Sequence, residues 1–225
     1  MPLPSIIAID GPVASGKSAV GQRLADELGY LFFDTGVMYR AVTYLALRDL
    51  KSVEDEVAVT ALAERAHLDL QPGPDGSRMW ADGEDITSEV RSLEVEACVS
   101  PVAAIPAVRQ ILTAQMRRVG LRGRVVMVGR DVGTVILPEA DLKIFLTASV
   151  ETRAWRRFQE VQARGEARTY EEILMNLRER DRIDASRTTA PLRSAGDAIT
   201  LDTTQLDLDG VVAAIERLIE SHSRD

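Results

Sequence analysis

The segment that most constrains the fold is residues 11–18, which read Gly-Pro-Val-Ala-Ser-Gly-Lys-Ser and fit the pattern Gly-x-x-x-x-Gly-Lys-Ser/Thr. An apolar, β-branched run over residues 5–10 precedes it, and apolar residues at helical spacing over residues 17–28 follow it. Glycine lets the backbone approach an anion closely, and the first turn of a helix presents unpaired N–H groups to that anion. The sequence therefore predicts a strand, a phosphate-binding loop and a helix in succession.

Two side chains of this loop have the chemistry that a nucleoside triphosphate requires. Lys17 supplies a cation to the β- and γ-phosphates, and the hydroxyl of Ser18 is a ligand for Mg²⁺. An ordinary glycine turn is the alternative, but a chance match is expected only about once per hundred proteins. The residues predicted to hold ATP are Gly11, Pro12, Val13, Ala14, Ser15, Gly16, Lys17, Ser18 and Ala19.

The rest of the chain alternates strand patterns with helix patterns. Further strands are predicted at residues 31–33, 124–128, 142–146 and 198–201. Further helices are predicted at residues 38–50, 54–66, 106–119, 150–164, 170–184 and 208–221. Strands that alternate with helices predict an α/β fold with a parallel sheet covered on both faces.

One stretch departs from this alternation. Residues 67–87 alternate apolar with polar side chains and contain a turn cluster at residues 72–76 and a second turn candidate at Asp82-Gly83. We therefore expect a small antiparallel β insert within the α/β chain.

Composition narrows the classes of function. The 225 residues carry a formal charge of −8, and aromatic residues make up only 4%. Both values argue against a protein that binds nucleic acid through a basic surface or by base stacking. The single cysteine, Cys98, allows no internal disulfide, and the sequence has neither a signal-peptide pattern nor an apolar run of membrane-spanning length. We expect a cytoplasmic protein without a membrane partner.

A second anion site is predicted beside the first. Thr35, Tyr39 and Arg40 follow the strand at residues 31–33, and Gly129-Arg130-Asp131 follows the strand at residues 124–128. The carboxyl ends of parallel strands line the ligand crevice, so both arginines would point toward an acceptor next to the triphosphate. The chain lacks an Asn-Lys-x-Asp guanine motif and a strand that ends in Asp-Glu, which favours a small-molecule kinase over a nucleotide-driven switch.

Arginines also gather further along the chain. Arg180, Asp184 and Arg187 are spaced to share one helix face, and Arg153, Arg156 and Arg157 lie on the preceding predicted helix. A solvated helix with internal salt bridges is the alternative interpretation of the first group. Two arginine-rich helices joined at Gly165 suggest a lid, at about residues 150–168, that excludes water from the γ-phosphate.

With these residues in place, the sequence resembles the bacterial cytidylate kinases. The resemblance runs through most of the chain. The motifs that carry it are Ile9-Asp-Gly-Pro12, Gly16-Lys-Ser18, Asp34-Thr-Gly-Val-Met-Tyr-Arg40, Gly129-Arg-Asp-Val-Gly-Thr134, Leu142-Lys-Ile-Phe-Leu-Thr-Ala-Ser149, Glu179-Arg-Asp-Arg-Ile-Asp-Ala-Ser-Arg187 and Ala190-Pro-Leu192.

The resemblance implies transfer of phosphate from Mg·ATP to CMP or dCMP, and a P-loop three-layer α/β fold with a five-stranded parallel sheet and a helical lid. It implies a core of residues 1–35 and 101–225, and a monophosphate-binding region of residues 36–100 that includes the insert at about 63–99. A monomer is expected.

The resemblance also implies roles for single residues. Arg40, Arg130 and Arg187 would bind the acceptor phosphate, and Arg180 and Asp184 would contact the sugar. Ser100, Arg109 and Asp131 would read cytosine, whose exocyclic amine donates to a carboxylate where uracil presents a carbonyl. The residues expected to line the acceptor site are Thr35, Tyr39, Arg40, Ser100, Arg109, Arg130, Asp131, Arg180, Asp184 and Arg187.

Catalysis in such a site would depend on positioning and charge neutralisation, because the acceptor oxygen is already anionic. We expect Lys17, Arg130, Arg153 and Arg157 to stabilise the transferring group. Two positions depart from the family pattern, Val128 in place of Asp and Ala14 in place of Gly. We expect Ala14 to avoid a backbone conformation reserved for glycine. A kinase for another acceptor and a non-catalytic ATP-dependent switch remain the rival interpretations.

Overall fold

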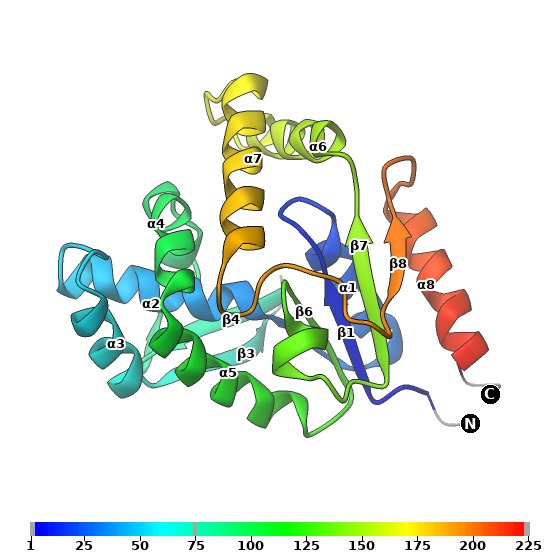
Figure 1. Cartoon of the computed structure of the whole chain (residues 1–225), viewed down its shortest axis with the longest axis horizontal. Coiled ribbons are helices and arrows are strands. Elements are labelled where there is room, and N and C mark those ends of the chain that lie inside the picture. Colours follow the sequence, from blue (N-terminus) through cyan, green and yellow to red (C-terminus); the bar gives the residue numbers. More distant parts are fainter. Residues whose placement is uncertain (1–2, 74–75, 223–225) are drawn as a thin grey trace.

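The central sheet of the computed structural model, which describes residues 3–73 and 76–222, has five parallel strands. The strands are β1 (Ile6–Asp10), β2 (Leu31–Asp34), β6 (Val125–Gly129), β7 (Leu142–Thr147) and β8 (Ile199–Asp202). Their order is β2-β6-β1-β7-β8, so β1 lies at the centre with the phosphate-binding loop at its carboxyl end (Figure 1). The predicted α/β fold with a five-stranded parallel sheet is confirmed.

Helices cover both faces of this sheet, and the central strands send alternate side chains to them. Ile7 and Ile9 of β1 join the cluster under α1 (Lys17–Leu28) and α8 (Leu208–His222), whereas Ala8 joins the cluster on the opposite face. The helices on that opposite side are α2 (Thr35–Asp49), α3 (Glu56–Arg65), α4 (Leu93–Ala104) and α5 (Pro106–Gly120). A strand buried on both faces reads as a continuous apolar run, as residues 6–9 do.

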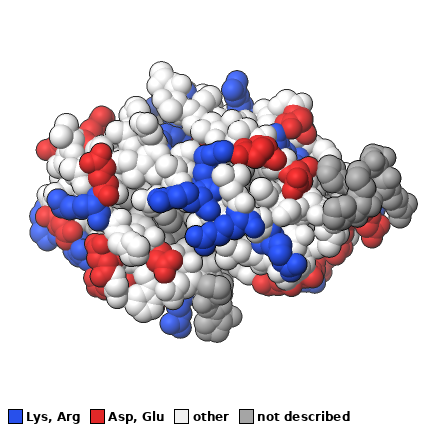
Figure 2. All heavy atoms as spheres, turned by 90° about the horizontal axis from the view of Figure 1, so that it is seen from below, with Lys and Arg blue, Asp and Glu red and all other residues white. Residues whose placement is uncertain are grey.

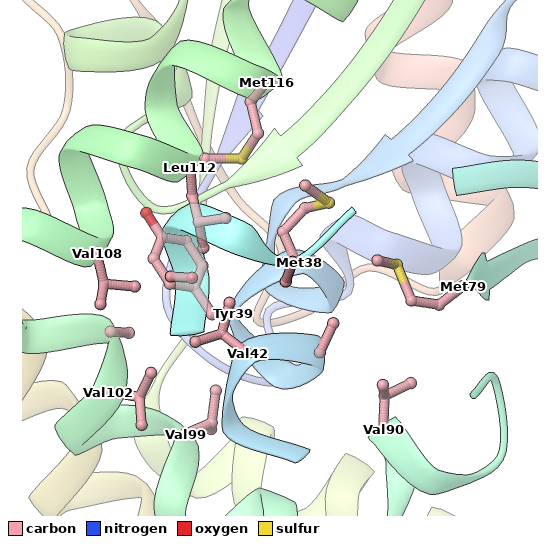
Figure 3. Close-up of a cluster of buried hydrophobic side chains, with 14 of the residues drawn as sticks. Met38, Tyr39, Val42, Met79, Val90, Val99, Val102, Val108, Leu112 and Met116 are labelled. Carbon is pink, nitrogen blue, oxygen red and sulfur yellow. The ribbon is translucent and has the colours of Figure 1, made fainter. Parts of the chain in front are cut away.

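The larger of the two apolar clusters packs α2 against α4 and α5. Figure 3 shows Tyr39 and Val42 of α2 lying among aliphatic side chains from α4 and α5. The neighbours drawn around them include Val99, Val102, Val108, Leu112 and Met116. Because aromatic residues are scarce, methionine and branched aliphatic side chains fill this space.

The insert is a three-stranded antiparallel sheet, as predicted. It consists of β3 (Leu68–Gly73), β4 (Gly76–Ala81) and β5 (Glu84–Asp85). Asp82 and Gly83 join β4 to β5 with φ angles of 52° and 85°, the left-handed pair that a tight hairpin turn requires. The second predicted turn is therefore confirmed. The centre of the first turn cluster, residues 74 and 75, lies outside the described residues.

Three elements were not expected from the sequence. They are α4, the 3₁₀ turn at Glu89–Arg91 and the π-helical turn at Val132–Ile136. Pro101 lies inside α4 and has no N–H for the helix ladder, which hides the helical pattern. Also, α2 begins at Thr35 rather than at residue 38, because the side chain of Asp34 caps it by accepting from the N–H of Gly36 (2.9 Å).

The two arginine-rich helices form a hairpin beyond the carboxyl ends of the strands. They are α6 (Val150–Ala163) and α7 (Tyr170–Ser186), and they stand above the sheet in Figure 1. Ala154, Val161, Ile173 and Leu177 form a small apolar cluster between them, separate from the two main clusters. A hairpin with its own cluster is a suitable unit for a lid, but the lid boundaries stay a prediction.

The surface facing away from this hairpin is mixed in charge. Seen from below, basic side chains cross the middle of this face and acidic side chains lie on both sides of them (Figure 2). In the described part of the chain no single helix has the length and apolarity to cross a bilayer. Only α4 and α5 taken together meet those two criteria, with a bend of 96° between them.

Candidate active site

The phosphate-binding loop leads from β1 into α1 through a left-handed turn. Gly16 has φ 91° at the start of α1, a conformation that favours glycine. Ala14 is also left-handed, with φ 58°. The expectation that Ala14 would avoid a glycine-type backbone is therefore wrong, and its left-handed conformation costs roughly 1 kcal/mol.

Lys17 is buried within this loop. Its Nζ donates to the carbonyl oxygen of Pro12 at 2.9 Å, and only 8% of the residue is exposed. Burial, followed by repulsion from Arg130, lowers the pKa of Lys17 to about 7, although Asp34 acts in the opposite direction. Near pH 7 the amine of Lys17 is therefore only partly protonated, and a phosphate bound beside it would favour the protonated, charged form.

Ser18 and Asp34 form an oxygen pair beside the loop. The hydroxyl of Ser18 donates to Oδ2 of Asp34 at 2.7 Å. A hydroxyl and a carboxylate are ligands that fit Mg²⁺, which commonly takes one or two protein oxygens together with water and substrate phosphates. Only Ser18 was predicted from the sequence to hold the metal, although Asp34 begins the Asp34-Thr-Gly-Val-Met-Tyr-Arg40 motif.

Val128, the departure from the family pattern, offers nothing to this pair. It is fully buried in the cluster beneath α1, and its side chain reaches within 2.5 Å of where a Cβ on Gly21 would lie. Its carbonyl oxygen accepts from the hydroxyl of Thr35 at 2.9 Å. The residue therefore ties β6 to the start of α2 and packs the sheet, and it brings no ligand oxygen from its side chain.

A cavity of about 440 Å³ connects the loop to the arginines. Ten basic and five acidic side chains are among its lining residues, so it favours an anion although the chain as a whole is acidic. The structure brings these predicted site residues to its wall: Val13, Ala14, Gly16, Lys17, Ser18, Ala19, Thr35, Tyr39, Arg40, Ser100, Arg109, Arg130, Asp131, Arg157, Arg180, Asp184 and Arg187. Of the remaining predicted residues, Gly11, Pro12, Ser15 and Arg153 are not among those that line it.

Asp184 organises the arginines at one end of this cavity. Its carboxylate accepts from Nε of Arg130 and pairs with Nη2 of Arg187 at 2.5 Å. Burial alone would raise the pKa of Asp184, but the charges of Arg130 and Arg187 outweigh it and hold that pKa below its usual value. The alternative interpretation of this helix face as solvated is wrong, since Arg180 and Asp184 are buried.

A second buried pair lies deeper in the cavity. Arg109 of α5 donates to Oδ2 of Asp131 and, at 3.0 Å, to the carbonyl oxygen of Ala103. The guanidinium of Arg109 also lies 5.2 Å from the centre of the Tyr39 ring. Both charged side chains are at most 5% exposed. Such a pair is costly to break and holds its donor and acceptor atoms in fixed directions.

The arginines of α6 point to three different places. Arg153 is held by Asp181 of α7 (2.6 Å) and by the carbonyl oxygens of Val13 and Ala148. Arg157 faces the cavity, where Nη2 donates to Glu96 at 2.8 Å. Arg156 also lines the cavity and donates to the carbonyl oxygen of Thr203. The geometry therefore favours Arg157 over Arg153 as a group that reaches a ligand.

Asp10, at the end of β1, holds a neighbouring backbone turn in place, a role that was not predicted from the sequence. Its carboxylate accepts from the backbone N–H groups of Val132 (2.8 Å) and Gly133 (2.7 Å), which follow Asp131 directly. Burial is the main cause that raises the pKa of Asp10 to about 6. Asp10 thus fixes the turn that carries Arg130 and Asp131, and its place in the Ile9-Asp-Gly-Pro12 motif was the available signal.

Comparison with known proteins identifies the family of the chain. The cytidylate kinase family model matches residues 7–221. The chain is 49% identical over 214 residues to a cytidylate kinase of Exiguobacterium sp., a match that covers 95% of this chain and 96% of that protein. It is 44% identical over 218 residues to a cytidylate kinase of Bacillus velezensis, covering 97% of each.

Among solved structures, an uncharacterized protein from Eubacterium ventriosum matches with a TM-score of 0.51 and 14% identity, covering 96% of this chain and 98% of that one. A match at this identity supports the fold alone. The family model and the two relatives carry the assignment, because they span nearly the whole chain. The chain belongs to the cytidylate kinase family.

Proposed function

We propose that the cavity between Lys17 and the arginine cluster is where this protein transfers the γ-phosphate of ATP to CMP or dCMP. The reaction itself follows from membership of the cytidylate kinase family. The observation that supports this location is the continuity of one arginine-lined cavity from the phosphate-binding loop to the Arg109–Asp131 pair. Two anionic ligands could lie end to end along it.

The acceptor phosphate would lie against Arg40, Arg130 and Arg187. Two details support an anion there. Nε of Arg180 and Nε of Arg187 are buried and, within the described structure, have no hydrogen-bond partner. Burial also lowers the pKa of Arg180 to about 10. Buried donors without partners are uncommon in folded proteins, and phosphate oxygens would satisfy them.

Cytosine would be read at the Arg109–Asp131 pair. The free lone pairs of the Asp131 carboxylate accept from the exocyclic amine, whereas Arg109 and Ser100 donate to the ring acceptors. Uracil would place a carbonyl against the carboxylate, and a mismatch of this kind discriminates strongly because a buried polar group loses its partner. The guanidinium of Arg109 donates to Oδ2 of Asp131 and fixes the direction in which the carboxylate faces.

The transfer step requires charge stabilisation rather than a base. The acceptor is a phosphate oxygen that is already anionic, so the protein has to align it with the γ-phosphate and neutralise the transferring group. Lys17, Arg130 and Arg157 are the cations that we propose for this neutralisation, while Arg153 holds the loop to α7. Ser18 and Asp34 would hold Mg²⁺, which when bound adds positive charge at the β- and γ-phosphates.

An acceptor panel tests this function. The purified protein is incubated with Mg·ATP and CMP, dCMP, UMP, dTMP or shikimate, and release of ADP is coupled to NADH oxidation. We expect release with CMP and dCMP, and much slower release with the others. Release with a different acceptor would favour a kinase of other specificity. Tight ATP binding without acceptor-dependent release would favour a nucleotide-driven switch.

Family membership makes small-molecule nucleotides the substrates of this chain. We propose in addition that the protein acts as a monomer in the cytoplasm and binds neither nucleic acid nor membranes. The mixed charge of the face shown in Figure 2 argues against nucleic-acid binding through that face, because it presents no uniform basic surface. Light scattering during size-exclusion chromatography tests the monomer, and a dimer mass would contradict it.

A further inference from the structure

One acidic side chain lies among the arginines of the cavity. Glu96 projects from α4, and its Oε2 accepts from Nη2 of Arg157 on α6 at 2.8 Å. Its Oε1 lies 3.5 Å from Nη1 of Arg180 on α7. The Glu96 side chain is only 14% exposed. It therefore connects the α6–α7 hairpin to the helix that carries Ser100, across the space where a phosphate is expected.

Glu96 does not satisfy all the hydrogen-bond donors of the arginines around it. Its Oε1 is 3.5 Å from Nη1 of Arg180, and the Nε of that arginine has no hydrogen-bond partner within the described structure. Burial lowers the pKa of Arg40, and the negative charge of Glu96 is the largest effect that opposes this shift. One carboxylate thus supplies one negative charge to three arginines. A phosphate offers up to two charges and three oxygens to the same groups.

We propose that Glu96 is the anion that occupies the arginine cluster between reaction cycles, and that the phosphate of the acceptor displaces it. Displacement frees Arg157 from α4, so that this cation becomes available to the transferring phosphate. Glu96 acts through Arg157 and is a positioning residue. A nucleoside without a phosphate has no charge to exchange for the carboxylate and leaves the pair intact. This inference rests on the proposed function, since it takes Arg40 and the buried Nε of Arg180 to lie next to the acceptor phosphate and Arg157 to reach the transferring phosphate.

An alternative role for Glu96 makes the opposite prediction. A carboxylate that only holds the arginines in their working orientation would improve phosphate binding, and its removal would weaken the affinity for CMP. Displacement predicts the reverse sign, because the incoming phosphate no longer competes with a resident charge. The sign of the change in affinity therefore separates the two roles.

The test uses Glu96→Gln, which keeps the shape and removes the charge. Isothermal titration calorimetry measures the binding of CMP and of cytidine to the wild-type protein and the variant. We expect CMP to bind about tenfold more tightly to the variant, a typical size for coupling between two such events, and cytidine to bind both proteins equally. In steady state the KM for CMP should fall.

A matched control is available on the same arginine. Glu160 contacts Nη1 of Arg157 at 3.0 Å, but from the same helix and with 55% of its side chain exposed. Glu160→Gln should leave the affinity for CMP unchanged. An equal gain in Glu160→Gln would show that any loss of charge near Arg157 suffices, and the inference about Glu96 would be wrong.

Unchanged or weaker CMP binding in Glu96→Gln overturns the inference while leaving the proposed function in place. Failure of the wild-type protein to bind CMP contradicts the proposed function itself. If Glu96→Gln does not fold, the wild-type protein supplies a second readout. The Nε–H resonance of Arg157 should shift during titration with CMP and stay in place with cytidine. A resonance that does not respond to CMP, or responds equally to cytidine, overturns the inference.

Discussion

Raising the pH above neutrality should weaken the binding of ATP, because Lys17 of the empty protein loses its proton there. Burial lowers the pKa of Lys17 from 10.5 to about 7. A triphosphate on the loop favours the charged ammonium and would return this pKa toward its ordinary value. The difference corresponds to about 5 kcal/mol of coupling between proton and nucleotide, which is an upper bound for the effect.

The sign follows from the direction of the shift. Below about pH 7 the lysine is charged in the free and the bound protein, and the affinity for ATP is independent of pH. Above that value the free protein has lost the proton and must take it up on binding, so the dissociation constant should rise about tenfold per pH unit. At about pH 8 the binding of one nucleotide should take up about 0.9 proton.

Calorimetry measures this uptake directly. A non-hydrolysable ATP analogue is titrated with Mg²⁺ at about pH 8 in HEPES and in Tris, whose ionisation enthalpies differ, and the difference in apparent enthalpy gives the number of protons. Lys17→Met is the matched control, since it fills the same space without a titratable group. No uptake by the wild-type protein, or equal uptake by both proteins, would refute the assignment of a near-neutral buried lysine on the loop.

Three further predictions concern Asp131, Ala14 and Asp10. Asp131→Asn should reduce the preference for CMP over UMP in kcat/KM by at least about tenfold. Because it leaves Arg109 unpaired, it should also lower the free energy of unfolding by about 3–5 kcal/mol. An unchanged preference would contradict the base-reading role. Ala14→Gly should raise the free energy of unfolding, measured in urea, by up to about 1 kcal/mol, because glycine adopts the left-handed backbone of this position without steric strain. A loss of stability would show that this backbone is unstrained. Burial raises the pKa of Asp10 to about 6, so protonation of Asp10 stabilises the folded wild-type protein as the pH falls. Asp10→Asn should therefore be more destabilising at about pH 4 than at about pH 7, by about 2 kcal/mol. A difference independent of pH would refute the raised pKa.

Local patterns were sufficient to predict the frame of the fold. The run at residues 6–9 is apolar at every position and forms the central strand, and α1 begins and ends at the predicted residues. Gly16 and Gly29 bound that helix with positive φ angles, and glycine is the residue expected at both places. The helix α4 was missed because Pro101 interrupts its pattern, although the surrounding tertiary contacts keep it helical.

The spacing of residues in the sequence does not predict which ion-pair and hydrogen-bond partners the site residues have. Arg153 and Arg157 lie one turn apart on α6 and looked equivalent, but only the structure shows that Arg153 meets Asp181 and that Arg157 meets Glu96. Asp10 contacts backbone groups 122 and 123 residues further along the chain. Such contacts depend on how the strand ends meet in three dimensions, and motif order alone gives the residues without their pairings.

The proposed function requires two nucleotides to bind in one cavity with their phosphates facing each other. A crystal structure with a non-hydrolysable ATP analogue, Mg²⁺ and CMP would show whether they do. We predict that the CMP phosphate contacts Arg40 and Arg130, that its base contacts Asp131, and that the γ-phosphate lies at Lys17 in line with it. A CMP molecule bound outside this cavity, or with its phosphate turned away from Lys17, would contradict the account.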